Sequence, residues 1–312
     1  MGFILDQTSV IDWLLKGDPA IRWQVIEDLL DGPAEQVVEE RAKIGTEGWG
    51  KHLLANQDAN GTWGHGLYSP KWISTTYTLL LLRRLGLPSD NAAACRAAQY
   101  LIDKGEWFDG GVIFWKRPIL DVCVLGLVLS IAVYFRLKDT RIAAMVECLS
   151  RHQADDGSWY DEVVDVAHKP FHITIAVLEG LHEYQQTLAM PDATVSAMIC
   201  AGQNFLLTHR LYLNAETNKP FDVAWTRFSF PPRWHYDVLR ALDHFQASHI
   251  PYDKRLQPAL ALVKKKQRTD GSWVLQNRHP GKAYFELESV GKPSRWNTLR
   301  ALRVLRCYQS NV

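Results

Sequence analysis

The chain has 312 residues, 47% of them hydrophobic, and a formal net charge of +1. Because lysine and arginine are scattered along it, the sequence lacks the basic stripe that nucleic-acid binding requires, and we expect no nucleic-acid partner. Its longest apolar run, 119–135, contains Asp121 and is too short for a membrane span, which predicts no transmembrane segment. The first residues lack the basic leader and apolar core of a signal peptide, so the expected compartment is the cytoplasm.

Helical patterns recur along the whole chain. The first begins at Pro19, a residue suited to the first turn of a helix, and a second pattern follows over 34–44. Longer helices with apolar cores are then predicted over 74–85, 120–135, 172–184, 234–245 and 297–308. Each of them follows a shorter helical pattern, and these patterns include Leu53, 97–102, 141–150, 201–206 and Val263, respectively. The chain therefore predicts about six helix pairs, which can stack as an open solenoid or close into a ring.

A seven-residue phrase occurs three times in this series, over 57–63, 153–159 and 267–273. Each copy has Gln first, Gly fifth and Trp last, and an aliphatic residue stands four positions before the Gln. Since Gly adopts a positive φ at no steric cost, each copy is expected to form the turn that ends a helix. The Gln side chain can bond backbone groups of that turn while the Trp packs on the neighbouring pair, so we interpret the phrase as structural.

This Gln-x-x-x-Gly-Ser/Thr-Trp phrase resembles the QW repeat of the terpenoid cyclase and prenyltransferase superfamily, over about residues 45–309. The resemblance implies an all-α fold, an α/α toroid of about six inner and outer helix pairs. It implies a single domain over 1–312, in which the helices of 1–44 complete the ring. It also places the active site near the N-terminal ends of the inner helices, where helix dipoles favour an anion.

Three residues at those helix starts are candidate metal ligands. Asp121 and Cys123 precede one apolar core and His172 opens the next helix, which resembles the zinc-supplying segments of protein prenyltransferase β subunits, although the gap from Cys123 to His172 is shorter here. A carboxylate, a thiolate and an imidazole with an open fourth position also match a catalytic zinc site. His168 is a competing ligand, and ordinary polar packing or a metal-free catalytic cluster remain alternatives. Helix capping could account for Asp121, and likewise for Thr174 and Ser294 on their own helices.

Four further residues are candidates for acid–base catalysis. His235 titrates near neutrality and Asp237 could orient it, but their spacing of two places them on different helical faces, and a core or capping role is the alternative. His65 and Asp109 lie in loops that are expected to cover the same end of the ring, where a turn role is the alternative.

Aromatic and cationic side chains beside these positions are candidate substrate contacts. An aromatic-walled cavity would suit an isoprenoid or a carbocation, while filling space between helices is the alternative. Two arginines of the set could recognise an anion. The candidates are Trp115, Arg233, Trp234, Tyr236, Arg295 and Trp296.

The leading hypothesis is an enzyme of the prenyltransferase or terpene-cyclase type, with zinc as its expected metal and an apolar or prenylated small molecule as its substrate. The Asp-x-Asp-Asp motif of triterpene cyclases is absent, and Asp155-Asp156 lies inside a repeat turn, which disfavours direct squalene cyclisation. A non-catalytic toroid that binds a ligand or a protein partner is one alternative, favoured by a pocket without a buried charged cluster. A polysaccharide-acting toroid enzyme is another, and it would require paired carboxylates across a cleft.

Overall fold

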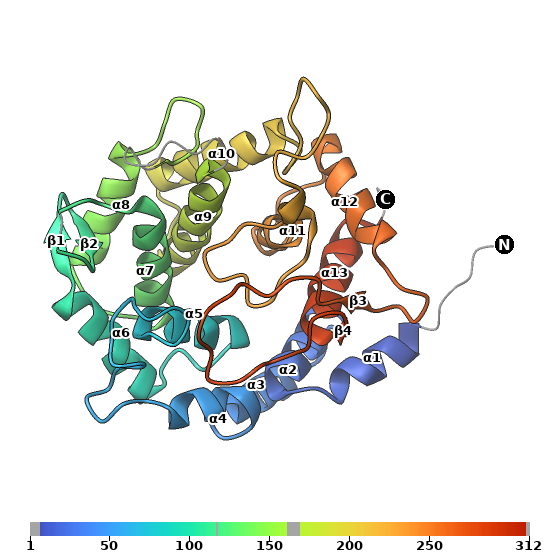
Figure 1. Ribbon diagram of the computed structural model, residues 1–312, viewed down its shortest axis with the longest axis horizontal. Helices are drawn as coiled ribbons and strands as arrows, with labels where there is room; N and C mark the ends of the chain where they lie inside the picture. Colours follow the sequence, from blue (N-terminus) through green and yellow to red (C-terminus); the bar gives the residue numbers. More distant parts are fainter. Residues whose placement is uncertain (1–6, 117, 161–168, 310–312) are drawn as a thin grey trace.

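The computed structural model describes residues 7–116, 118–160 and 169–309, and Figure 1 shows its helices in two layers around a centre. The inner layer consists of α2 (Pro19–Asp28), α5 (Thr75–Leu85), α7 (Val122–Tyr134), α9 (Lys169–Thr187), α11 (Val238–Ala247) and α13 (Arg295–Cys307). The outer layer consists of α1 (Gln7–Leu15), α4 (Gly48–Ala55), α6 (Ala92–Lys104), α8 (Arg141–Arg151), α10 (Ala193–Thr208) and α12 (Gln257–Lys265). The expected all-α fold is confirmed.

The remaining elements are short. Helix α3 (Ala34–Ala42) packs on α2, and single 3-10 turns form η1 (Lys43–Gly45), η2 (Val223–Thr226) and η3 (Lys254–Leu256). Strands β1 (Glu106–Phe108) and β2 (Gly111–Ile113) form an antiparallel hairpin, and β3 (Trp273–Val274) pairs with β4 (Pro293–Ser294). Helix α1 and these strands were not predicted from the sequence; the strands are only two or three residues long. None of the described helices combines the length and the apolar character that crossing a membrane needs.

The first and last inner helices meet and close the inner layer. Arg303 of α13 pairs with Asp28 of α2 at 2.9 Å and donates to Gln24 Oε1 at the same distance. On the other side of α2, Trp23 Nε1 donates to the carbonyl of Leu85 at the end of α5, at 2.9 Å. Figure 1 shows α2 beside α13 in this arrangement, so the N-terminal helices lie between the two ends of the repeat series.

The repeated phrase fastens each outer helix to the inner helix that follows it. In the second copy, Trp159 Nε1 donates to the carbonyl of Leu149 at 2.7 Å, and its backbone N–H donates to Thr174 Oγ1 at 3.1 Å. Gln153 Nε2 donates to Gly157 O at 2.9 Å, inside the turn. Equivalent contacts join Trp63 to Leu53 and Thr75, Gln57 to Gly61, Trp273 to Val263 and Thr298, and Gln267 to Gly271. The structural interpretation of the phrase is therefore confirmed.

Two of the inner helices start three or more residues from the expected position. Helix α11 begins at Val238 rather than near 234, because Asp237 caps it by accepting the Arg240 N–H at 2.8 Å. Helix α9 begins at Lys169, so Thr174 lies inside it and serves as the acceptor for the second phrase instead of as a cap. Ser294 does cap α13, accepting the N–H of Asn297 at 2.9 Å.

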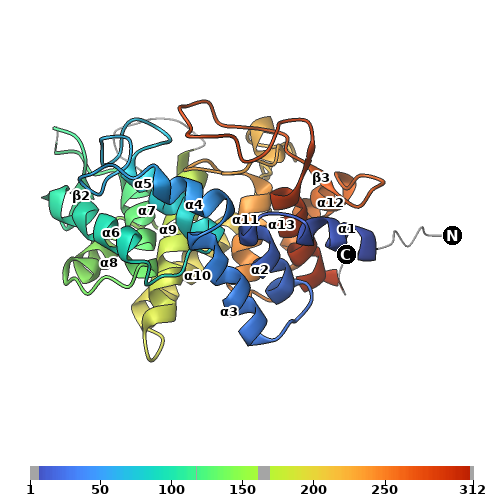
Figure 2. The ribbon, with the colours of Figure 1, turned by 90° about the horizontal axis from the view of Figure 1, so that it is seen from below.

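Inner helices α7 and α9 approach each other closely because each has a glycine at the contact. A Cβ at Gly126 would lie 2.8 Å from the backbone of Val177, and a Cβ at Gly180 would lie 2.6 Å from the Gly126 carbonyl. The loops that precede the inner helices gather on one side of the ring, as Figure 2 shows. We call this side, where α5, α7, α9, α11 and α13 begin, the N-terminal pole.

Candidate functional site

The N-terminal pole carries aromatic rings around a partly buried lysine, Lys71. Its Nζ lies 5.1 Å from the ring centre of Tyr68, 5.7 Å from that of Trp72 and 5.6 Å from that of Trp234. Burial lowers the pKa of Lys71, while the nearby Asp121 acts in the opposite direction by favouring the ammonium form. The faces of these rings make cation–π contacts with the ammonium group, so the rings stabilise a positive charge at this position.

Three histidines lie beside these rings. His235 stacks between Trp234 and His279, with ring centres 3.8 Å from both. Its ring centre also lies 5.9 Å from that of His172. Burial, with help from the neighbouring imidazoles, lowers the pKa of His235 to about 2, and burial lowers the pKa of His279 to about 4. Both rings are therefore neutral at physiological pH and act as hydrogen-bond partners rather than as charges.

The three residues expected to hold zinc lie at the starts of the neighbouring inner helices α7 and α9. In these positions they do not fit a zinc site. His172 Nδ1 accepts the backbone N–H of Tyr236 at 2.7 Å, so its neutral ring carries its proton on Nε2. A zinc-bound imidazole instead donates from the nitrogen that does not bind the metal. Asp121 Oδ1 accepts the N–H of Val124 at 2.9 Å as the cap of α7. The competing ligand His168 lies outside the described residues.

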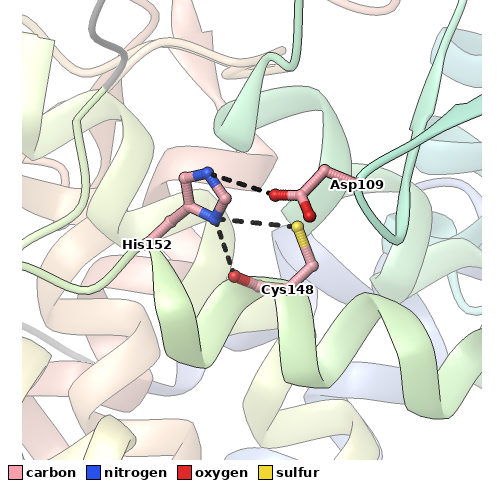
Figure 3. A group of neighbouring side chains, drawn as sticks. All are labelled: Asp109, Cys148 and His152. Carbon is pink, nitrogen blue, oxygen red and sulfur yellow. Dashed lines mark hydrogen bonds and ion pairs between the residues drawn. The ribbon is translucent and has the colours of Figure 1, made fainter.

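Among the described residues, the side chains that bring three ligand atoms within 4.8 Å of one another are Asp109, Cys148 and His152 (Figure 3). Cys148 Sγ lies 3.7 Å from His152 Nδ1, whereas Asp109 Oδ2 lies 4.0 Å from the other nitrogen, Nε2, so the two partners approach different nitrogens of the imidazole. Arg151 already pairs with Asp109 at 2.9 Å, and burial raises the pKa of the Cys148 thiol to about 11. This group, which includes the predicted catalytic residue Asp109, therefore fits neither a cation nor a thiolate nucleophile.

Two other predicted catalytic residues have structural contacts. Asp237 is 1% exposed, and besides capping α11 it accepts the hydroxyl of Ser229 at 2.7 Å. The side chain of His65 is 87% exposed and lies 3.3 Å from Asp58, in the turn of the first phrase. Asp237 thus holds the 228–237 loop that carries His235, and His65 lies on the surface.

The predicted substrate contacts separate into two groups. Trp115 lies against the Tyr68 ring at 6.0 Å, and the guanidinium of Arg233 lies 5.5 Å from the Trp72 ring centre, so both belong to the lysine cluster with Trp234. Burial lowers the pKa of Arg233 to about 10.

The other three predicted contacts lie elsewhere. The Tyr236 hydroxyl donates to the carbonyl of Leu211 at 2.5 Å in a buried aromatic group, and Arg295 lies over the Trp13 ring of α1 at 4.5 Å. The rings of Trp296 and Phe230 stack with their centres 4.1 Å apart, and Trp296 lines a cavity among the inner helices.

Two cavities meet at Phe230. A central cavity of about 280 Å³ lies among the inner helices, and a cavity of about 20 Å³ lies at the N-terminal pole between Trp72, Arg233 and His279. The smaller cavity holds about one water molecule. The 276–292 loop covers it, since Trp72 N–H donates to Lys282 O at 2.8 Å and Trp72 Nε1 donates to Pro280 O at 2.9 Å.

Sequence reasoning missed Tyr68, Lys71, Trp72 and His279, which lie in loops without periodicity. One signal could have found two of them: a basic residue followed by Trp precedes or opens an inner helix at 71–72, 233–234 and 295–296. Only the last two of these pairs were among the predicted site residues.

No family model matches the chain, and no curated protein matches it. Among solved structures, it is similar to a protein from Actinoplanes, with a TM-score of 0.49 and 17% identity over 97% of this chain and 98% of that one. It is also similar to the type II terpene cyclase MstE from Scytonema in its apo form, with a TM-score of 0.46 and 16% identity over 98% of both chains. At these identities and scores, neither likeness carries a functional argument.

Proposed function

We propose that the protein is an enzyme of the terpenoid cyclase and prenyltransferase type, which converts a small, largely apolar molecule at the N-terminal pole. The observation that carries this proposal is the enclosure of the Lys71 ammonium by the rings of Tyr68, Trp72 and Trp234. Ring faces that hold an ammonium would also stabilise positive charge developing on a substrate carbon. The repeated phrase, which resembles the QW repeat, supports the same class.

Lys71 is the proposed proton-transfer group. Its burial favours loss of the proton, and the nearby carboxylate of Asp121 keeps the ammonium accessible, so the two effects bring its pKa toward the working range of an acid–base group. His235 and His279 are neutral and would orient polar atoms of the substrate. Zinc has no role in this proposal, because the imidazole of His172 presents a proton where a metal would bind.

The polar environment holds the cluster in place. Arg240 Nη1 donates to the carbonyl of His235 at 2.8 Å, and Arg240 itself pairs with Glu179 at 2.9 Å. Substrate entry requires the 276–292 loop to move, because the cavity beside Trp72 holds about one water molecule.

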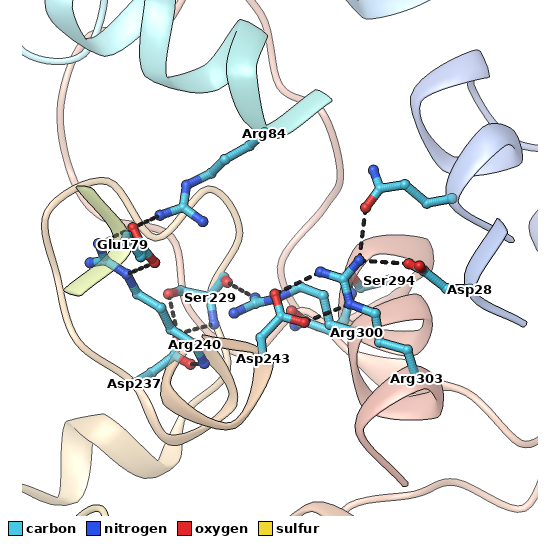
Figure 4. Close-up of polar contacts among 12 residues, drawn as sticks. Asp28, Arg84, Glu179, Ser229, Asp237, Arg240, Asp243, Ser294, Arg300 and Arg303 are labelled. Carbon is cyan, nitrogen blue, oxygen red and sulfur yellow. Dashed lines mark hydrogen bonds and ion pairs between the residues drawn. The ribbon is translucent and has the colours of Figure 1, made fainter. Parts of the chain in front are cut away.

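The two alternative functions have less support. The ring contains a buried charged cluster, the feature whose absence would favour a non-catalytic toroid (Figure 4). A glycosidase needs a carboxyl group whose pKa is raised so that it can act as an acid. The buried Glu179 and Asp243 have lowered pKa values instead, because arginines compensate their burial. Burial does raise the pKa of Glu288, but its carboxylate is held by the Ser294 hydroxyl and the backbone N–H of Arg295 at the start of α13.

The test is turnover of a panel of apolar substrates by the full-length protein, with prenyl diphosphates of increasing length and linear isoprenoid hydrocarbons, and products identified by gas chromatography and mass spectrometry. We expect Lys71→Met, which keeps the side-chain length and removes the charge, to lower kcat at least 100-fold, within the range that one acid–base group contributes. The matched control is Lys51→Met on the exposed face of α4. An active Lys71→Met variant, or a wild-type protein that neither binds nor converts any member of the panel, would refute the proposal.

A further inference from the structure

The inner helices carry a network of buried charges around the central cavity (Figure 4). Glu179 of α9 pairs with Arg84 at 2.7 Å and with Arg240 at 2.9 Å. Asp243 of α11 likewise pairs with Arg303 at 2.6 Å and with Arg300 at 3.3 Å. Each carboxylate is shared between two guanidinium groups, so the network holds more positive than negative charge.

The charges that line the central cavity show the same excess. Its lining includes five arginines but three carboxylates, namely Arg41, Arg83, Arg84, Arg300 and Arg303 against Glu179, Glu183 and Asp243. Behind the lining, Asp28 and Arg240 add one charge of each sign, and the exposed Glu27 adds one negative charge near Arg41. His182 and His244 also line the cavity, and burial lowers the pKa of both, so they carry no charge at neutral pH. The net charge of the side chains around the cavity therefore stays positive.

Two residues of the lining have buried donors without an acceptor in the described part of the chain. One donor is Nη2 of Arg300, a residue that is 2% exposed, and the other is Nε1 of Trp296, which is also 2% exposed. A buried donor that lacks a partner is costly to the fold, so such donors are rare unless something else satisfies them. Both residues line the cavity, but the two donor atoms themselves are not exposed to it, so an acceptor placed there would reach them after a small shift of the two side chains.

Arg41, which also lines the cavity, carries a positive charge that no carboxylate of the described residues neutralises directly. Among the described residues, Arg41 makes no salt bridge, and its guanidinium donates to the Gly86 carbonyl at 2.8 Å and to the Tyr134 hydroxyl at 2.9 Å. It also lies over the Trp23 ring at 5.0 Å. Neutral acceptors fix the guanidinium at the cavity but leave its charge available to an anion.

We infer that the central cavity is a binding site for an oxyanion, such as a phosphate or sulfate group, carried by a small molecule. Arg300 and Trp296 supply hydrogen-bond donors, Arg41 supplies an uncompensated charge, and the aromatic rings of the lining can contact an apolar remainder of the ligand. The cavity, about 280 Å³, is large enough for such a group with a short substituent. This site shares Phe230 with the smaller cavity at the N-terminal pole but does not depend on the function proposed for that pole.

The test is isothermal titration calorimetry of the full-length protein with inorganic phosphate and, separately, with sulfate, at constant ionic strength set by chloride. We expect saturable binding of at least one of the two with 1:1 stoichiometry. Arg41→Gln removes the charge without leaving a carboxylate unpaired, and it should weaken binding about tenfold. Trp296→Phe keeps the ring on Phe230 but removes the N–H, and it should weaken binding a few-fold.

The matched control is Arg151→Gln, which removes a surface arginine of α8 and should leave the affinity unchanged. If Arg41→Gln does not fold, the anion affinity of the Trp296→Phe variant tests the inference. The inference is overturned if neither anion binds at about 10 mM, above the ordinary range of small-ligand affinities. It is also overturned if the folded cavity variants bind as tightly as the wild type.

Discussion

The fastening role of the repeated phrase can be tested by removing a single oxygen atom. Thr174 and Trp159 are both fully buried, and Thr174 Oγ1 accepts the Trp159 backbone N–H at 3.1 Å. Thr174→Val keeps the size and the β-branch of the side chain but leaves this N–H without its acceptor.

The expected cost follows from two opposing effects. A buried N–H that loses its partner costs about 1–3 kcal/mol. Exchanging a buried hydroxyl for a methyl group recovers up to about 0.8 kcal/mol through hydrophobic burial. The free energy of unfolding should therefore fall by about 1–2 kcal/mol for this variant, and by a similar amount for Thr75→Val and Thr298→Val, whose oxygens accept equivalent N–H groups.

Urea unfolding followed by circular dichroism measures this cost. With an m-value of about 3 kcal/mol/M, the midpoint should fall by roughly 0.3–0.7 M while the slope stays unchanged. The control is Thr78→Val. Thr78 lies in α5 and is 1% exposed, and within the described residues its Oγ1 approaches the Ile73 carbonyl alone, at 3.4 Å. That carbonyl keeps the Tyr284 hydroxyl as a partner, so the control should be nearly neutral. A Thr174→Val variant as stable as the wild type, or a control equally destabilised, would show that the phrase does not fasten the helices through this bond.

Two further predictions concern the packing and the pH dependence of the ring. Gly126→Ala should lower the free energy of unfolding by about 1–3 kcal/mol in urea denaturation, because the new Cβ would lie 2.8 Å from the Val177 backbone and force α7 and α9 apart. Gly45→Ala, whose nearest neighbours are 3.9 Å away, should be tolerated, and equal costs for the two would contradict this reasoning. Burial lowers the pKa of His244 to about 3, so between that value and about 6.5 the unfolded chain binds more protons and stability falls as pH falls. His244→Leu should reduce the slope of stability against pH by about 1.4 kcal/mol per pH unit across pH 4–6, and a slope that persists in His244→Leu would contradict the assignment.

Local patterns predicted the architecture well because its signals are short-range. The phrase at 153–159 places a glycine, a glutamine and a tryptophan within one turn, and Gln153 and Trp159 each make one of their side-chain bonds within that segment or to the helix before it. The apolar periodicity of 74–85 and 120–135 likewise matched α5 and α7 to within two residues at either end. The start of α11 was expected near 234, but Asp237, for which capping was the alternative to catalysis, caps the helix and sets its start at Val238.

The candidate site was harder to predict because its members come from loops far apart in the sequence. Lys71 meets Trp234 only because the inner layer closes and brings the loop before α5 against the loop before α11. Hydrogen-bond direction is also a tertiary property: the sequence offers His172 as a zinc ligand, but the N–H of Tyr236 occupies its Nδ1.

The sequence by itself determined the helix pairs, their fastening turns and the end of the ring where polar residues gather, since each depends on residues close together in the chain. Only the tertiary structure decided which side chains share a cavity. The enclosure of Lys71 by three rings and the excess of arginines around the central cavity both arise where distant helices and loops converge. The physical reason is that burial, which sets the pKa of a histidine or leaves an arginine donor without a partner, is a property of the closed ring and not of any one segment.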